Sequence, residues 1–183
     1  MKKLSIFEIA AIAKTGNYPA SALTDVDCIV GQSFGTSIHK GSPNSLLAKF
    51  IAYLHDTINV PIIAQQEIAE ILQRDYSITP DCIVKGDPST KNGEGLTSYG
   101  VLSKAKEFMQ KTHWRPMIIT QAFLAARASR QAQILNASPV LPYKLPRIFD
   151  PESDQRWTRN LRQWLWRENF FGLLYLKFVM GKL

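Results

Sequence analysis

The hexapeptide VDCIVG at residues 26–31 is a short apolar run rich in β-branched side chains, and such a run predicts a buried strand. Three similar runs follow it in the chain: VPIIA at 60–64, DCIVK at 81–85 and PMIIT at 116–120. None of the four alternates apolar with polar residues, which is typical of strands in a parallel sheet that is covered on both faces.

A helical pattern follows each of these strands, at residues 44–57, 66–72, 95–111 and 123–136. Strands that alternate with helices form βαβ units with right-handed crossovers, so we expect an α/β fold with three layers. The segment PVLPY at 139–143 resembles a strand but carries prolines, and we expect it at a sheet edge or outside the sheet.

The two ends of the chain differ from this core. Ser5 and Glu8 fit a capping box, which favours a helix over 5–14 rather than a signal peptide, and we assign residues 1–150 to one α/β domain. Residues 151–183 are expected to hold a long helix over about 154–180, which docks on the domain or on a partner copy in a homodimer. An interfacial membrane helix with arginines on its polar face is the alternative.

Composition narrows the classes of partner. The formal charge is +7, but Lys and Arg are spread along the chain, whereas nucleic-acid binding would require a dense basic stripe. No apolar run approaches the roughly 18 residues that suggest a membrane span. Cys28 and Cys82 both lie in predicted buried strands, where thiols stay reduced, and this favours the cytoplasm.

The pentapeptide GQSFG at 31–35 fits G-x-S-x-G, the turn that presents a nucleophilic serine in many hydrolases. A Ser33, Asp87 and His113 triad has the required chain order. However, the next helix begins only after Ser42, and His113 precedes the fourth strand, at the end of the sheet opposite Ser33. A serine hydrolase is therefore kept as an alternative function.

Metal and phosphate-loop motifs are not found in the sequence. The three histidines are scattered without HExxH or CxxC spacing, so we predict no metal site. Neither GxGxxG after a strand nor GxxxxGK[ST] occurs, so the common dinucleotide and P-loop fingerprints are missing.

The polar stretch GDPSTKNGEG at 86–95 follows the third predicted strand. Parallel strands end on the same side of a sheet, so this loop is expected to meet the loops at 31–35 and 120–121 there. Their hydroxyls, small residues and helix N-terminal amides favour an anionic, nucleotide-type or polyhydroxylated ligand. Within the 86–95 stretch, however, Asp-Pro-Ser-Thr and Asn-Gly also form turns and helix caps. The predicted ligand-binding residues are Ser33, Gly35, Asp87, Ser89, Thr90, Glu94, Thr120, Gln121 and Arg127.

Two of these loops resemble the YdcF/SanA/ElyC-like group of bacterial α/β proteins. Its third-strand loop reads acidic-x-x-Ser-Thr-Asn-x-x-Glu-Asn, which Ser89, Thr90 and Glu94 match. Its later stretch reads Thr/Val-Ser/Gln-Asp-x-x-x-x-Arg, which is matched by Thr120, Gln121 and Arg127. The chain departs from the two patterns at Gly86, Gly95, Ala122 and Leu124.

The resemblance covers roughly residues 26–136 and implies a Rossmann-like fold. It also implies S-adenosylmethionine as a ligand, and members of the group are linked to envelope processes. The expected function is therefore binding of a small polar molecule, with no assigned reaction.

Overall fold

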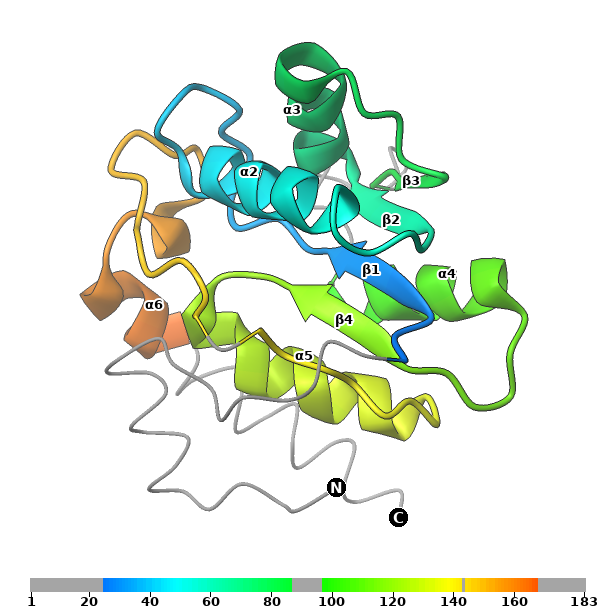
Figure 1. Ribbon diagram of the computed structural model, residues 1–183. Helices are drawn as coiled ribbons and strands as arrows, with labels where there is room; N and C mark the ends of the chain where they lie inside the picture. The colour runs from blue at the N-terminus through cyan, green and yellow to red at the C-terminus, as the bar shows by residue number, and fades with distance from the viewer. Residues whose placement is uncertain (1–24, 87–96, 143, 168–183) are drawn as a thin grey trace.

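The computed structural model describes residues 25–86, 97–142 and 144–167 (Figure 1). The expected helix at 5–14 lies outside this range. So do residues 87–96 of the polar loop and the final segment 168–183.

The sheet has four parallel strands in the order β3-β2-β1-β4. They are β1 (Cys28–Gly31), β2 (Ile62–Gln65), β3 (Cys82–Val84) and β4 (Pro116–Ile119). Gly31 at the end of β1 pairs with Ala64 on one side and Ile119 on the other, so the carboxyl ends of the central strands are level. The chain runs from β1 outward to β3 and then returns to β4 beyond β1, which makes the β1–β4 pair the point where strand order reverses.

Helices cover both faces of the sheet, so the predicted three-layer α/β fold of Rossmann-like type is confirmed (Figure 1). On one face α2 (Pro43–His55) and α3 (Gln66–Tyr76) bury Leu47 and Ile68 against Ile29. On the other, α4 (Ser98–Met109) and α5 (Ala122–Ile134) bury Leu102 and Ala125 against Val30. Adjacent residues of β1 therefore serve different cores, which explains why the strand is apolar throughout.

Side-chain caps fix where three helices start, all at the carboxyl side of the strands. The Ser42 side chain accepts a hydrogen bond from the Ser45 amide at the start of α2, and Thr97 accepts one from Gly100 at the start of α4. Oε1 of Gln121 accepts one from the Phe123 amide at 2.8 Å. Each cap satisfies an amide that the first turn leaves without a partner.

The segment after α5 returns to the outer edge of β4, as its prolines predicted. The Val140 amide donates to the Pro116 carbonyl at 2.8 Å, and the Ile118 amide donates to the Val140 carbonyl at 2.9 Å. Pro139 and Pro142 flank Val140, and neither has an amide N–H to donate to a further strand.

The prediction of one helix from about residue 154 is wrong at its start. A 3₁₀ turn spans Arg156–Thr158, and α6 begins only at Leu161 and is described to Arg167. Local polar side chains cause the break: the Thr158 hydroxyl donates to the Gln155 carbonyl at 2.8 Å, and Oδ1 of Asn160 accepts from the Gln163 amide at 2.9 Å. Such bonds compete with a continuous helix.

Both cysteines are free thiols at different depths. Cys28 lies fully buried in the central strand β1, where burial chiefly raises the pKa of its thiol to about 12. Cys82 is half-buried on the edge strand β3, and burial also raises its pKa.

Candidate ligand site at the carboxyl edge of the sheet

The loop that follows β1 is fixed by neighbouring elements in three successive residues. The Gln32 amide donates to the Ile119 carbonyl at 2.9 Å, which extends the pairing with β4 beyond the strand. The Ser33 amide donates to Oε1 of Gln65 at 3.1 Å, at the end of β2. The Phe34 amide then donates to Oδ1 of Asn44.

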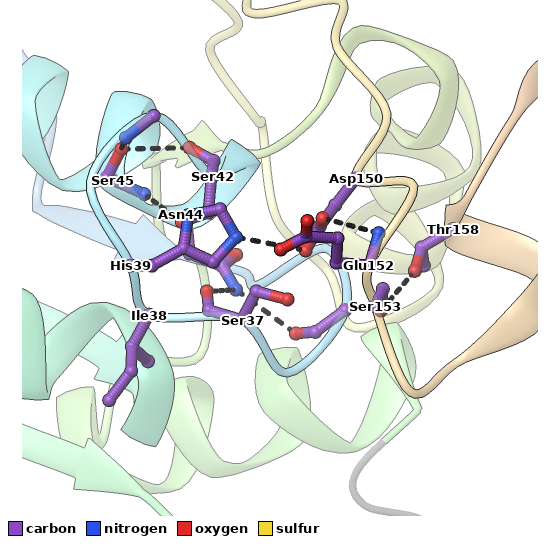
Figure 2. A network of polar contacts seen from close by, with 12 residues as sticks. Ser37, Ile38, His39, Ser42, Asn44, Ser45, Asp150, Glu152, Ser153 and Thr158 are labelled. Carbon is purple, nitrogen blue, oxygen red and sulfur yellow. Dashed lines mark hydrogen bonds and ion pairs between the residues drawn. The ribbon is translucent and has the colours of Figure 1, made fainter.

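Asn44, in the first turn of α2, holds the rest of this loop from inside. Its Nδ2 donates to the Gly35 carbonyl at 3.1 Å and to the Ser37 carbonyl at 3.0 Å (Figure 2). Gly35 has φ +82°, a left-handed conformation that favours glycine. These hydrogen bonds and the conformation of Gly35 together fix the path of the loop.

Glu67 lies two residues beyond β2, in the first turn of α3, and faces Ser33. Burial raises the pKa of its carboxyl, although hydrogen bonds from its own amide and from the Ser33 side chain oppose the shift. Its Oε2 is buried and has no hydrogen-bond partner within the described part of the chain. A carboxylate oxygen without a partner can accept a hydrogen bond.

Two more buried polar atoms at this edge have no partner among the described residues, namely Oε1 of Gln32 after β1 and Oγ1 of Thr120 after β4. Gln32 is held by its other end, because its Nε2 donates to the Ser98 carbonyl at 3.1 Å at the start of α4. Leaving a buried polar group unpaired costs about 1–3 kcal/mol. Three such atoms follow three of the strands, while Nε1 of Trp114, Oε1 of Gln131 and Oδ2 of Asp150 are buried without a hydrogen-bond partner in other parts of the described chain.

An aromatic cluster stands beside these polar groups, and it joins the loop after β1 and the start of α5 to the C-terminal segment. The ring centroids of Phe34 lie 5.7 Å from Phe149 and 5.9 Å from Trp157, and those of Phe123 and Trp164 are 5.2 Å apart. Figure 1 shows α6 on the side towards which the arrowheads of β1 and β4 point. The described part of the C-terminal segment thus packs against the domain.

The C-terminal segment also makes polar and close contacts with the loop that follows β1. Nε2 of His39 lies 3.7 Å from Oδ2 of Asp150, whose side chain is almost fully buried (Figure 2). A Cβ atom on Gly35 would lie 2.9 Å from Oγ of Ser153 and 3.0 Å from Oγ1 of Thr158. The glycine therefore provides both the backbone conformation and the room for this close approach.

The predicted site residues occupy different environments. Ser33 is half-buried beside Gln65 and Glu67, whereas Gly35 lies under the C-terminal segment. Thr120 and Gln121 are fully buried, and Nε2 of Gln121 also donates to the Ile148 carbonyl at 3.0 Å. Arg127 is half-buried in the second turn of α5. The predicted residues Asp87, Ser89, Thr90 and Glu94 lie outside the described residues.

Three residues of this edge were not predicted from the sequence: Gln32, Gln65 and Glu67. The usable signal was their position, because Gln32 directly follows β1, Gln65 is the last residue of β2, and Glu67 comes two residues later. Side chains at the carboxyl ends of parallel strands face the ligand crevice in folds of this type.

The proposed triad of the serine hydrolase alternative is not assembled by the described residues. Ser33 lies at the carboxyl end of β1, while the exposed His113 lies just before the amino end of β4. The hydrogen bond that holds Ser33 runs from its amide to Oε1 of Gln65, at 3.1 Å. In addition, α2 begins at Pro43, so no helix follows Ser33 directly.

Within the part of the chain that the structure describes, no group of three or more His, Cys, Asp or Glu side chains is placed to hold a metal ion. No described helix combines the length and apolar character needed to cross a membrane. Comparison with protein-family models, with curated proteins and with solved structures finds no match for this chain. The function is therefore inferred from the residues at the carboxyl edge of the sheet.

Proposed function

We propose that the protein binds a polar small molecule of nucleoside or nucleotide type at the carboxyl edge of its sheet. The observation that carries this proposal is the set of three buried polar atoms without partners in the described chain: Oε1 of Gln32, Oε2 of Glu67 and Oγ1 of Thr120. The three atoms follow three different strands and therefore come from three separate segments of the chain.

The chemistry of these atoms limits the ligand. An amide oxygen and an ionised carboxylate oxygen only accept hydrogen bonds, and a threonine hydroxyl both donates and accepts. The matching ligand must therefore carry several O–H or N–H donors. Nucleosides and their derivatives meet this requirement through sugar hydroxyls and base amino groups.

S-adenosylmethionine belongs to the proposed ligand set, and this part of the proposal rests on the likeness of two loops to the YdcF/SanA/ElyC-like group. The two free thiols support a cytoplasmic location, since reducing compartments maintain free cysteine. No reaction is assigned to the site.

A thermal-shift screen tests the proposal with ribonucleosides, nucleotides, S-adenosylmethionine, sugars and amino acids. We expect at least one compound to raise the Tm of the wild type and to have a smaller effect on Glu67→Ala. Glu107→Gln is the matched control, because Glu107 is an exposed carboxylate near the end of α4, and its ion-pair partner among the described residues is Lys104. Equal shifts in all three proteins would place binding elsewhere, and no shift with any compound would overturn the proposal.

A second candidate function, a membrane-surface module, is favoured by the outer side of α6. Leu161, Leu165 and Trp166 are 41%, 43% and 67% exposed, and Arg162 lies between them in sequence. Exposed apolar side chains interspersed with arginines suit the interface of an anionic bilayer. Co-sedimentation with phosphatidylserine vesicles that is lost in Leu165→Ser would support this function, and absence of wild-type co-sedimentation would overturn it.

A further inference from the structure

We infer that the contact between His39 and Asp150 is a pH-dependent attachment, which holds residues 149–158 against the loop after β1 when the His39 ring is protonated. Residues 149–158 precede α6 and end with the 3₁₀ turn. The inference concerns how this part of the chain is held, and it does not depend on which ligand binds at the carboxyl edge.

The surroundings of the His39 ring determine what each of its nitrogens can do. Nδ1 lies 3.1 Å from the Lys40 carbonyl oxygen, and a carbonyl only accepts hydrogen bonds, so Nδ1 carries a hydrogen in this contact. Nε2, which faces Oδ2 of Asp150 at 3.7 Å, then has only a lone pair in the neutral ring (Figure 2). It becomes a donor when the ring takes up a second proton. The contact therefore joins two acceptors when the ring is neutral, and a donor with an acceptor when the ring is charged.

The carboxylate of Asp150 is the buried member of this pair. Its side chain is 3% exposed, and its Oδ1 accepts from the Glu152 amide at 3.0 Å. Its Oδ2 is buried and has no hydrogen-bond partner within the described part of the chain. A buried anion is costly unless it is paired, so a charged imidazole at Oδ2 stabilises it. The Asp150 amide also donates to the Thr158 carbonyl at 3.0 Å, which ties the position of the carboxylate to that of the whole 149–158 turn.

Other charged side chains surround the pair, and they come from the loop after β1, from α3 and from the C-terminal segment. Arg74 of α3 donates through Nη2 to the Ile38 carbonyl at 3.0 Å, and its charge is balanced by Asp75, with Nε and Oδ1 2.7 Å apart. Carboxyl, ammonium and guanidinium groups ordinarily keep their charge between about pH 5.5 and about pH 8, whereas an imidazole changes its charge in this range. The charged neighbours are Lys40, Arg74, Asp75, Glu152 and Arg159.

A second histidine–aspartate pair provides a comparison at the same separation. Nδ1 of His55 lies 3.7 Å from Oδ1 of Asp56, but the two side chains are 46% and 83% exposed. Water solvates both charges, and the two residues are adjacent in the chain, so protonation of His55 attaches no separate segment. The buried carboxylate is therefore the feature that distinguishes the pair of His39 and Asp150.

Hydrogen exchange of single amides, followed by NMR at about pH 5.5 and about pH 8, tests the inference. The reporting amides are those of Asp150, Ser153 and Thr158, which donate within the 149–158 turn. After correction for intrinsic rates, and relative to the amides of β1, their wild-type protection should be greater at the lower pH by up to about fivefold. This factor corresponds to the roughly 1 kcal/mol available to a pair with one solvated partner.

Three variants show whether this difference comes from the pair. His39→Gln and Asp150→Asn should each remove it, and the double variant should remove no more, because both changes act on one contact. Asp150→Asn retains the Oδ1 that accepts from the Glu152 amide, and His39 is more than half exposed, so we expect both variants to fold. His55→Gln is the matched control and should keep the wild-type difference.

Equal wild-type protection at the two pH values would overturn the inference. So would a difference that persists in His39→Gln, or one that is lost equally in His55→Gln. Repeating the measurement with EDTA tests a different occupant, since a divalent cation can also lie between two acceptors. Wild-type protection at about pH 8 that falls on addition of EDTA would replace the proton by a cation and would also overturn the inference.

Discussion

Ser33 and Phe34 are neighbours in the chain, yet their side chains belong to two regions of opposite character. Phe34 is fully buried in the aromatic cluster with Phe149 and Trp157, and it ties the loop to the C-terminal segment. Ser33 lies on the side of β2, beside Gln65 and Glu67, where polar atoms lack partners within the described chain. The difference teaches that one loop contributes both stability and a candidate binding surface. Four predictions test how independently it does so.

The largest effect is expected for Phe34→Ala, which empties the centre of the aromatic cluster. Truncation of a buried phenylalanine costs about 3–5 kcal/mol, and urea unfolding followed by tryptophan fluorescence measures it. Tyr53→Ala, at a residue 68% exposed on α2, is the control and should cost under about 1 kcal/mol. A small loss in Phe34→Ala would mean that the C-terminal segment contributes little to the folded state.

Gly35→Ala should have the next largest effect, and Gly41→Ala supplies its matched control. Both glycines have positive φ, +82° and +90°, so both substitutions carry a backbone cost of about 1–2 kcal/mol. A Cβ at Gly41 meets nothing within 4 Å, whereas one at Gly35 meets Ser153 and Thr158. Gly35→Ala should therefore be less stable than Gly41→Ala by a further 1–3 kcal/mol or so, the usual cost of overpacking. Equal losses of stability in the two variants would contradict this, because they would show that Ser153 and Thr158 move away from the new methyl group at no energetic cost.

Glu67→Gln should change stability in the opposite direction. The folded pKa of Glu67 is raised above 4.5, so the folded state binds this proton more tightly than the unfolded state. The stability that this proton contributes is complete below pH 4.5 and is lost as the pH rises through the folded pKa. At pH 7 Glu67→Gln should be more stable than the wild type by up to about 1 kcal/mol, with no gain at pH 4. Urea unfolding at both pH values measures this, and a variant less stable at pH 7 would contradict it.

The smallest effect is expected for the contact between His39 and Asp150. The His39 side chain is 53% exposed while that of Asp150 is 3% exposed, and solvent around the imidazole limits the interaction to about 1 kcal/mol. A double-mutant cycle with His39→Ala and Asp150→Asn measures the coupling. A coupling well above this limit would mean that the contact, rather than the aromatic cluster, dominates the attachment of the C-terminal segment.

The four strands were predictable because each is a short apolar run in the sequence, which indicates a buried strand. An apolar run between Gly and Pro residues has few alternatives to a buried strand, and the side chains of β1 confirm this. The C-terminal helix was predicted too long, since the spacing of Trp157, Leu161 and Trp164 is helical while the side chains of Thr158 and Asn160 interrupt the backbone. The spacing of apolar residues does not reveal hydrogen bonds between side chains and the backbone that interrupt a helix.

The candidate site was predictable only in its general location. Gln65 and Glu67 resemble the solvated first turn of a helix in sequence, but Gln65 accepts from the Ser33 amide, more than thirty positions earlier in the chain, and Glu67 is half-buried. Gln121 was predicted only as a candidate ligand contact, and the structure shows that its side chain also caps α5. The structure places both ends of its amide in bonds to the backbone, and its contact with a ligand stays a prediction.

The two thiols give the molecule chemical reporters of opening at two depths. Cys82 lies half-buried on the edge strand β3, so a small separation of that edge exposes it to an alkylating reagent. Cys28 lies in a central strand between β2 and β4, and its high pKa leaves almost no thiolate at neutral pH. Modification of Cys82 therefore records local fraying, whereas modification of Cys28 records loss of the whole sheet, and the ratio of the two rates measures how cooperatively the protein unfolds under native conditions.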